Sequence, residues 1–258
     1  MIKTNVSLKA YNTFGIECYT KRFASFSSTE ELALILEERN DDELLILGGG
    51  SNILLTKDFE GLAIRNEIKG FEVIKEDEDT VLIKSGGGEV WHEFVLKCID
   101  NNFGGIENLS LIPGSVGASP MQNIGAYGVE IKDIFQELEA YHIETGKVET
   151  FKHSDCSFGY RESVFKRALK NQYIITSVTF RLTKKHQLNT KYGAVTAELE
   201  QMGVEKPTIK DISNAVIAIR SSKLPNPKEI GNAGSFFKNP VVDSSILELI
   251  NKNYSSVP

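Results

Sequence analysis

The sequence lacks the features that mark several classes of protein. It has only 3 cysteines in 258 residues, and because they are scattered, neither a disulfide framework nor a Cys/His zinc site is expected. No apolar run approaches the roughly 18 residues of a membrane span, and the N-terminus has no continuous apolar stretch of a secretory signal. The formal net charge of -6 argues against a nucleic-acid-binding surface. We therefore expect a cytoplasmic protein with no bound metal, no nucleic-acid partner and no membrane insertion.

The composition is that of an ordinary globular protein, with 41% hydrophobic and 25% charged residues. The length predicts one or two domains. Residues 29–38 and 208–220 have helical periodicity, and Ser28 is a suitable N-cap for the first. Short apolar runs predict buried strands at 44–47 and 62–65. Further expected elements are a hairpin at 71–84, a helix at 90–101, a strand–turn–strand at 137–150, a strand at 173–182 and a helix at 244–251.

The first glycine-rich loop consists of Gly48, Gly49, Gly50, Ser51 and Asn52 and follows a predicted strand. Consecutive glycines let backbone N–H groups approach an anion closely, and the two polar side chains add hydrogen-bond donors. The loop matches neither GxGxxG nor GxxxxGK[ST]. A phosphate site and a simple tight turn therefore both remain open.

The second loop, residues 112–128 (IPGSVGASPMQNIGAYG), has four glycines and two prolines. Such a segment cannot form a regular helix or strand over its whole length. Its serines, with Gln122 and Asn123, offer neutral hydrogen-bonding groups that suit a dinucleotide and a flavin ring. Long irregular loops usually have a function, although an irregular connector is the alternative.

Six segments, in this order, resemble the UDP-N-acetylenolpyruvoylglucosamine reductases. They are residues 11–14 (YNTF), 47–54 (LGGGSNIL), 113–128 (PGSVGASPMQNIGAYG), 158–166 (FGYRESVFK), 220–225 (RSSKLP) and 231–240 (GNAGSFFKNP). The resemblance implies an α+β fold: a two-subdomain FAD-binding fold of the vanillyl-alcohol-oxidase type, with subdomains at 1–68 and 69–207, and the start of a substrate domain at 208–258. It implies that the protein reduces an enolpyruvyl UDP-sugar with NADPH through FAD, in peptidoglycan-precursor synthesis. The implied partners are small molecules, and the implied state is a monomer.

The resemblance also implies roles for individual residues. Arg161 and Tyr160 would lie beside flavin and substrate, and Ser235 would be the proton donor. Arginine suits the task because its planar fork can clamp a carboxylate while negative charge develops on it. Serine is a weak acid and needs a cationic neighbour, for which Lys238 and Lys223 are candidates. FAD would be held by Gly48, Gly49, Gly50, Ser51, Asn52, Pro113, Gly114, Ser115, Gly117, Ala118, Gln122, Asn123, Gly125, Ala126, Tyr127 and Gly128, and the substrate by Tyr192, Lys223 and Asn239.

One departure from the family pattern leaves alternatives open. The family carries a catalytic glutamate near its C-terminus, which nothing after Pro240 matches, and neither Asp243 nor Glu248 is assigned this role. We therefore expect an incomplete chain, the alternative being a short protein that binds flavin but is impaired. A different oxidoreductase of the same fold, or a non-catalytic flavin- or nucleotide-binding protein, are the other hypotheses. The four histidines (His92, His142, His153 and His186) are scattered and are expected at the surface.

Overall fold

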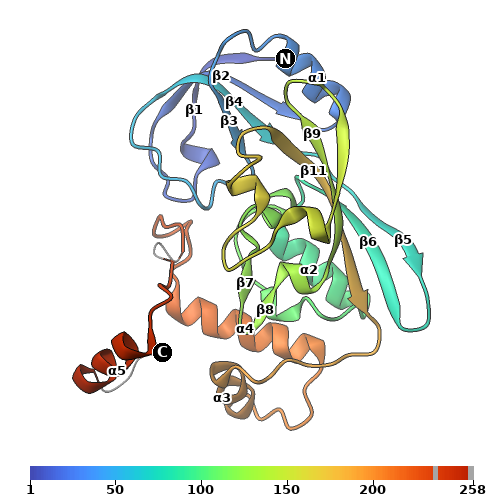
Figure 1. Cartoon of the computed structure of the whole chain (residues 1–258), viewed down its shortest axis with the longest axis vertical. Helices are drawn as coiled ribbons and strands as arrows, with labels where there is room; N and C mark the ends of the chain where they lie inside the picture. The colour runs from blue at the N-terminus through green and yellow to red at the C-terminus, as the bar shows by residue number, and fades with distance from the viewer. Residues whose placement is uncertain (235–237, 255–258) are drawn as a thin grey trace.

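The first sheet lies at the N-terminal end of the molecule (Figure 1). The computed structural model describes residues 1–234 and 238–254. The sheet has the strand order β1-β2-β4-β3, with β1 (Lys3–Ser7), β2 (Tyr19–Phe26), β3 (Leu44–Leu47) and β4 (Phe59–Asn66). Strand β1 is antiparallel to β2, whereas β2 and β3 both run parallel to β4. Helix α1 (Thr29–Glu37) covers the sheet by burying Leu32 and Ile35 against Leu62 and Ile64.

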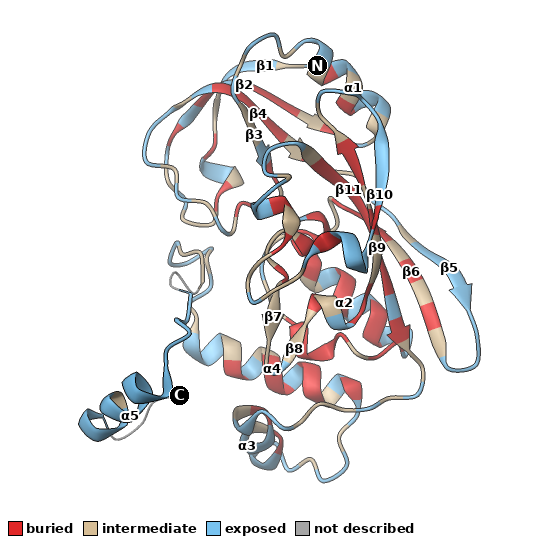
Figure 2. Cartoon of the chain, viewed as in Figure 1, coloured by how far each residue is buried: buried red, intermediate tan, exposed pale blue. Residues whose placement is uncertain are grey.

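The second sheet is antiparallel and has the order β10-β9-β11-β6-β5. Its strands are β5 (Phe71–Glu76), β6 (Thr80–Gly86), β9 (Phe135–His142), β10 (Val148–Lys152) and β11 (Tyr173–Thr183). Helix α2 (Trp91–Asp100) packs on this sheet through a cluster of buried aromatic side chains. The ring centroid of Phe180 lies 4.9 Å from that of Phe94 and 5.8 Å from that of Trp91. Figure 2 shows the buried residues following the central strand β11, while the edge strand β5 is largely exposed.

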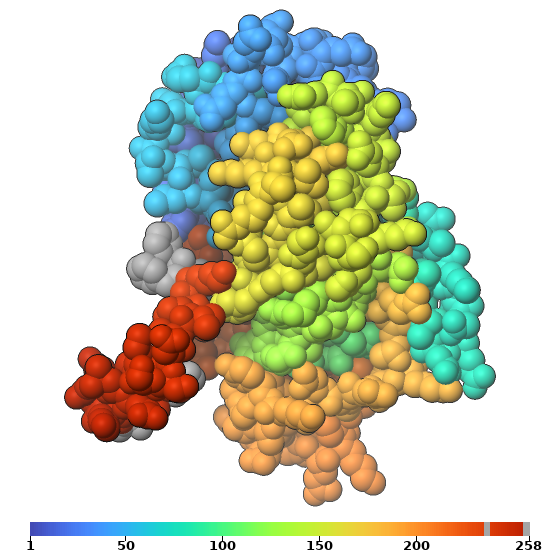
Figure 3. Space-filling view, in the orientation of Figure 1, coloured from blue at the N-terminus to red at the C-terminus, as the bar shows by residue number. Residues whose placement is uncertain are grey.

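Three helices follow the second sheet. Helix α4 (Ile209–Lys223) begins with a capping box in which the Thr208 and Asp211 side chains accept each other's backbone N–H. Helix α3 (Gly193–Gln201) packs on α4 through Val195 and Leu199. Helix α5 (Ser244–Asn253) buries none of its residues and projects from the body, as Figure 3 shows.

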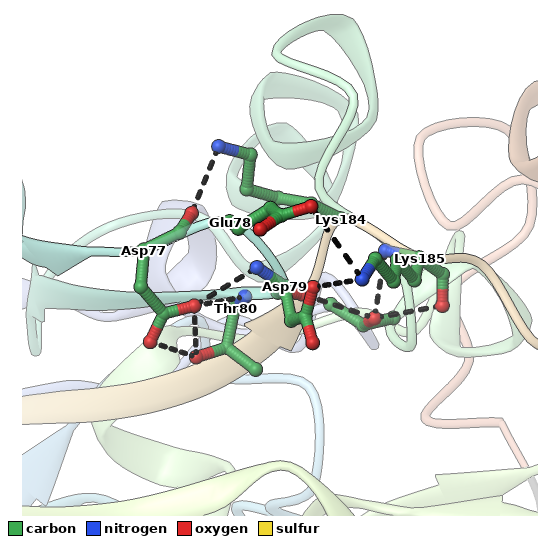
Figure 4. Close-up of polar contacts among 7 residues, drawn as sticks. Asp77, Glu78, Asp79, Thr80, Lys184 and Lys185 are labelled. Atoms are coloured by element: carbon green, nitrogen blue, oxygen red, sulfur yellow. Dashed lines mark hydrogen bonds and ion pairs between the residues drawn. The ribbon is translucent and has the colours of Figure 1, made fainter.

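Polar contacts fix the tip of the β5–β6 hairpin to the end of β11 (Figure 4). The Asp77 carboxylate accepts the N–H groups of Asp79 at 2.9 Å and Thr80 at 2.7 Å. Lys184 donates to the Asp77 carbonyl at 3.0 Å, and Lys185 pairs with Asp79. Since these groups are exposed, each ion pair contributes little stability, and the cluster serves mainly to order the turn.

The structure confirms the α+β class and every element that the sequence predicts, with small shifts of the ends. The predicted helix at 208–220 continues to Lys223, and the loop at 112–128 is irregular except for two 3-10 turns, Val116–Ala118 and Pro120–Gln122, and one short strand. That strand, β7 (Gly125–Ala126), pairs with β8 (Val129–Glu130). Strands β1 and β2 and helix α3 are not among the predicted elements.

Candidate functional site

The two glycine-rich loops face each other across a cavity of about 360 Å³. One wall is residues 46–53, at the C-terminal end of β3, and the other comes from residues 113–124. Trp91 and Lys166 complete the lining. A second cavity of about 130 Å³ shares Gly48 and Ser115 with the first. Cavities of this kind are typical of sites for small molecules and cofactors.

Glycine is required where the first loop approaches neighbouring backbone. A Cβ atom at Gly49 would lie 2.7 Å from Gly114 Cα, and one at Gly50, whose φ is +62°, would overlap the carbonyl oxygen of Tyr11. The backbone N–H groups of residues 49–52 donate no hydrogen bond to any residue that the structure describes. Because these residues also line the cavity, their N–H groups form a site suited to an anion such as phosphate.

Hydrogen bonds hold the second loop in place. Asn52 Nδ2 donates to Gln122 Oε1 at 3.3 Å and so links the two loops. Asn123 is fully buried with φ +45°. Its Nδ2 donates to Glu130 Oε2 at 3.1 Å and to the Gly159 carbonyl at 2.9 Å, while its Oδ1 accepts the Lys132 N–H at 3.1 Å. The Asn123 side chain is therefore fully used within the protein.

The expected FAD residues separate into two groups. Those in one or both cavity linings are Gly48, Gly49, Gly50, Ser51, Asn52, Pro113, Gly114, Ser115, Gly117, Ala118 and Gln122. Asn123, Gly125, Ala126, Tyr127 and Gly128 line neither of these two cavities. The last part of the second loop instead supports Arg161, whose Nη2 donates to the Gly125 carbonyl at 2.5 Å.

Two cationic side chains that are distant in sequence from each other lie at the ring of Tyr160. The Arg161 guanidinium carbon lies 5.2 Å from the centroid of the Tyr160 ring, and Lys238 Nζ lies 5.3 Å from the same centroid. Cations at such distances are attracted to the electron-rich face of the ring. The contact brings Lys238 to Tyr160 of the 158–166 segment. Ser235, the expected proton donor, lies outside the described residues.

The expected substrate-binding residues have fewer contacts with other residues. Tyr192 packs edge-on against Tyr127 of the second loop, with ring centroids 5.4 Å apart. Lys223 is the last residue of α4, and both it and Asn239 are exposed. The structure records no hydrogen bond from either of these two side chains to another described residue.

Two side chains that the sequence analysis did not assign hold the entrance to the second loop. Leu111 has φ +57°; its N–H donates to His92 Nδ1 at 2.9 Å, and its carbonyl accepts from Arg220 Nε at 3.1 Å. Burial lowers the pKa of His92 below its usual value, which favours the neutral ring that can accept this hydrogen bond. The expectation of a surface position holds for the exposed His153, whereas His92, His142 and His186 are half-buried.

Residues 1–234 and 238–254 contain neither a membrane-spanning helix nor a cluster of metal ligands. None of the helices there is long and apolar enough to cross a membrane. No cluster of three or more histidine, cysteine, aspartate or glutamate side chains there could hold a metal ion.

The comparisons first define the class of protein. Residues 20–152 match the family model described as an FAD binding domain. This range contains both glycine-rich loops, so the chain has the FAD-binding domain of a flavoprotein.

The relatives then define the family. The chain is 58% identical to the UDP-N-acetylenolpyruvoylglucosamine reductase of Flavobacterium johnsoniae, over 98% of this chain and 75% of that protein. It is 48% identical to the reductase of the same name from Amoebophilus asiaticus, over 100% of this chain and 76% of that one. The chain therefore belongs to the UDP-N-acetylenolpyruvoylglucosamine reductase family, as its motifs predict.

A solved structure supports the fold. The UDP-N-acetylenolpyruvylglucosamine reductase of Thermus caldophilus superposes with a TM-score of 0.68, at 22% sequence identity, over 98% of this chain and 80% of that one. At this identity the likeness concerns the fold alone, and it confirms the expected architecture.

Proposed function

We propose that this protein reduces the enolpyruvyl group of UDP-N-acetylenolpyruvoylglucosamine to the lactyl group of UDP-N-acetylmuramate, using FAD and NADPH, in the cytoplasm. The observation that carries the proposal is the contact of Arg161 and Lys238 with Tyr160, which is linked through the Lys166–Arg161 hydrogen bond to the cavity between the glycine-rich loops. The identity of 58% to a reductase of this name supports it. The reaction consumes one NADPH and one proton for each double bond reduced.

The cavity fits FAD in its shape and in its donors. The glycines let the two backbones come close together, and the N–H groups of residues 49–52 suit the diphosphate. The neutral lining from residues 113–124 suits the flavin ring. With FAD held there, the site would have a hydride carrier between NADPH and the β-carbon of the enolpyruvyl group.

Arg161 is the residue that we assign to the substrate carboxylate. Hydride addition at the β-carbon puts negative charge on the α-carbon and the carboxylate, and a guanidinium stabilises this charge more strongly as it forms. The side chain is aimed by the Gly125 carbonyl and by the Tyr160 ring. Tyr160 is partly exposed and has a hydroxyl with which to hydrogen-bond the substrate.

Ser235 would complete the reduction by giving a proton to the α-carbon. A serine hydroxyl becomes a useful acid only where a nearby cation stabilises the alkoxide that remains. Lys238 follows it by three residues and lies over Tyr160 at 5.3 Å. This supports Lys238 as the cation that would assist the expected proton transfer.

The remaining assignments concern the substrate and the organisation of the chain. We assign Tyr192, Lys223 and Asn239 to the UDP-sugar, with the Tyr192–Tyr127 contact as the support for the first. We divide the chain into FAD-binding parts at 1–68 and 69–207 and a substrate part at 208–258. The two sheets, drawn from residues 3–66 and 71–183, support the first boundary. We expect the protein to act as a monomer.

The test follows the flavin spectrum of the purified protein. A yellow protein with bound-flavin absorbance is expected, and NADPH should bleach it. Adding the enolpyruvyl UDP-sugar should then restore the oxidised spectrum. A colourless protein that takes up no FAD would refute the proposal. Bleaching by NADPH with no response to the sugar would instead indicate an impaired flavin-binding protein or a different oxidoreductase.

A variant separates the two half-reactions. Ser235→Ala should leave the reduction of flavin by NADPH intact and slow the reoxidation by the sugar. Equal slowing of both steps would contradict the role of Ser235 as proton donor.

A further inference from the structure

Lys166 is the one charged residue in the lining of the larger cavity, among the residues that the structure describes. The other polar groups of that lining are neutral backbone, hydroxyl and amide groups. The diphosphate of FAD carries two negative charges near neutral pH. A lining that otherwise offers only neutral donors leaves Lys166 as the natural partner for this charge.

The backbone that carries Lys166 is fixed against the second glycine-rich loop. Ser163, which is buried, donates from Oγ to the Met121 carbonyl at 2.6 Å, and the Lys166 N–H donates to the Ser163 carbonyl at 3.1 Å. Phe165 is buried with its ring 5.1 Å from that of Phe151. The start of the Lys166 side chain therefore has a defined place at the cavity, although its end is exposed.

The ammonium group of Lys166 also touches the expected catalytic arginine. Its Nζ donates to the Arg161 carbonyl at 3.0 Å. Arg161 has φ +55°, a conformation that non-glycine residues adopt uncommonly and that needs support from its surroundings. An ammonium has three N–H donors, so one bond to this carbonyl leaves two for a ligand in the cavity.

We propose that Lys166 binds the diphosphate of FAD and, through its bond to the Arg161 carbonyl, makes the position of Arg161 depend on whether FAD is bound. The proposal rests on the FAD site described above. It makes Lys166 a cofactor-binding residue and a positioning residue for Arg161. Binding of FAD would then hold the backbone of the substrate-binding arginine more firmly in place.

The experiment compares FAD with riboflavin, which has the same ring system but no phosphate. Protein freed of flavin is titrated with each, following the fluorescence of the flavin. Lys166→Met should weaken FAD binding about tenfold, as expected for a lost hydrogen bond to a charged group, and leave riboflavin binding unchanged. Lys166→Arg should restore most of the FAD affinity. Lys170→Met, which removes an exposed lysine four residues further along, is the matched control and should bind FAD normally.

Hydrogen exchange tests the link to Arg161. Saturating FAD should slow amide exchange across residues 159–162 in the unchanged protein, and this protection should be largely absent in Lys166→Met even when FAD is saturating. Protection that is equal in both proteins would overturn the link.

Other outcomes would overturn the diphosphate assignment. An equal loss of FAD and riboflavin affinity in Lys166→Met would give Lys166 a purely structural role. Unchanged affinity for both, with a raised KM for NADPH, would show that Lys166 contacts the nucleotide substrate instead. If the unchanged protein binds neither flavin, the proposed function fails and the assignment falls with it.

Discussion

The Arg161 side chain is held mainly by neutral groups, which leaves its charge available. Its Nη2 contacts the Gly125 carbonyl at 2.5 Å, whereas the Glu130 carboxylate lies 4.0 Å from Nη1. Arg161→Lys keeps the charge but loses the planar fork. We expect it to slow the reoxidation of reduced flavin by the sugar, at a cost of about 2–4 kcal/mol in activation free energy. The reduction of flavin by NADPH should be unchanged, as stopped-flow absorbance would show.

Arg167→Lys provides the matched control for this prediction. Arg167 lies in the same segment but pairs with Glu162 at 2.6 Å and is mostly exposed. Both half-reactions should keep their rates in this variant. If Arg161→Lys slowed the two half-reactions to the same extent, a general disturbance of the site would be the better explanation.

Sequence motifs predict the role of a residue well where that role depends on its neighbours in the sequence. They predict it poorly where the role depends on partners that are distant in the sequence. The glycines at 48–50 predict a tight loop, and the resemblance of residues 47–54 to the family gives that loop its expected role in binding FAD. Lys166 and Arg220 both belong to recognised segments. Lys166 nevertheless lines a cavity that is built from distant loops, and Arg220 binds the carbonyl of Leu111, which is also distant in sequence. The role of Asn123 depends in the same way on the Gly159 carbonyl. No pattern in the sequence indicates such contacts.

Helix α2 holds the second glycine-rich loop through His92, and this makes the loop sensitive to acid. The folded protein keeps the pKa of His92 below its value of 6.5 in the unfolded chain, mainly because the ring is buried. The charged groups that act on it are Glu93 and Arg220. The unfolded chain therefore binds a proton more readily. The stabilisation from neutral His92 is complete above about pH 6.5 and is lost as the pH falls toward the lowered value.

The measurement is the free energy of unfolding by urea between pH 8 and pH 5. We expect the unchanged protein to lose stability more steeply below pH 6.5 than His92→Gln, whose side chain does not titrate. FAD affinity should fall over the same range, because Leu111 leads directly into the loop. His153→Gln is the control, because His153 is exposed and its replacement should leave the pH dependence of the free energy of unfolding unchanged. Parallel profiles for His92→Gln and the unchanged protein would exclude His92 as the cause.

The elements that the sequence predicts are those whose burial follows one simple period. Helix α4 buries Ile209, Ile212, Val216 and Ile219, and the helical spacing of these residues is plain. Helix α3 buries only Val195 and Leu199, because one narrow face meets α4, and its periodicity is correspondingly weak. Strand β2 is covered on both faces, because Ala24 and Phe26 pack in the cluster that includes α1 whereas Phe23 packs in a separate cluster, so its burial does not simply alternate.

Two segments that are distant in the sequence are joined at Thr13 and Asn232. Thr13 Oγ1 donates to the Asn232 carbonyl at 2.6 Å, and the Asn232 N–H donates to the Thr13 carbonyl at 3.1 Å. The backbone at Gly231 lies so close to Phe14 that a Cβ there would overlap the Phe14 carbonyl oxygen. This junction connects the first sheet to the segment that carries the expected proton donor, and neither motif predicts it alone.

Two substitutions measure what the junction contributes to the whole molecule. Thr13→Val should lower the free energy of unfolding by about 1 kcal/mol, because one hydrogen bond is lost. Thr13→Ser keeps the hydroxyl and should cost less. Gly231→Ala should cost more, about 1–3 kcal/mol, because the added methyl group forces the two backbones apart.

The proposed function adds a kinetic expectation: Gly231→Ala should slow flavin reoxidation by the sugar more than flavin reduction by NADPH, since the junction supports the 231–240 segment. Unfolding in urea and stopped-flow absorbance check the two effects separately, and a Gly231→Ala protein as stable as the unchanged one would rule out the close junction.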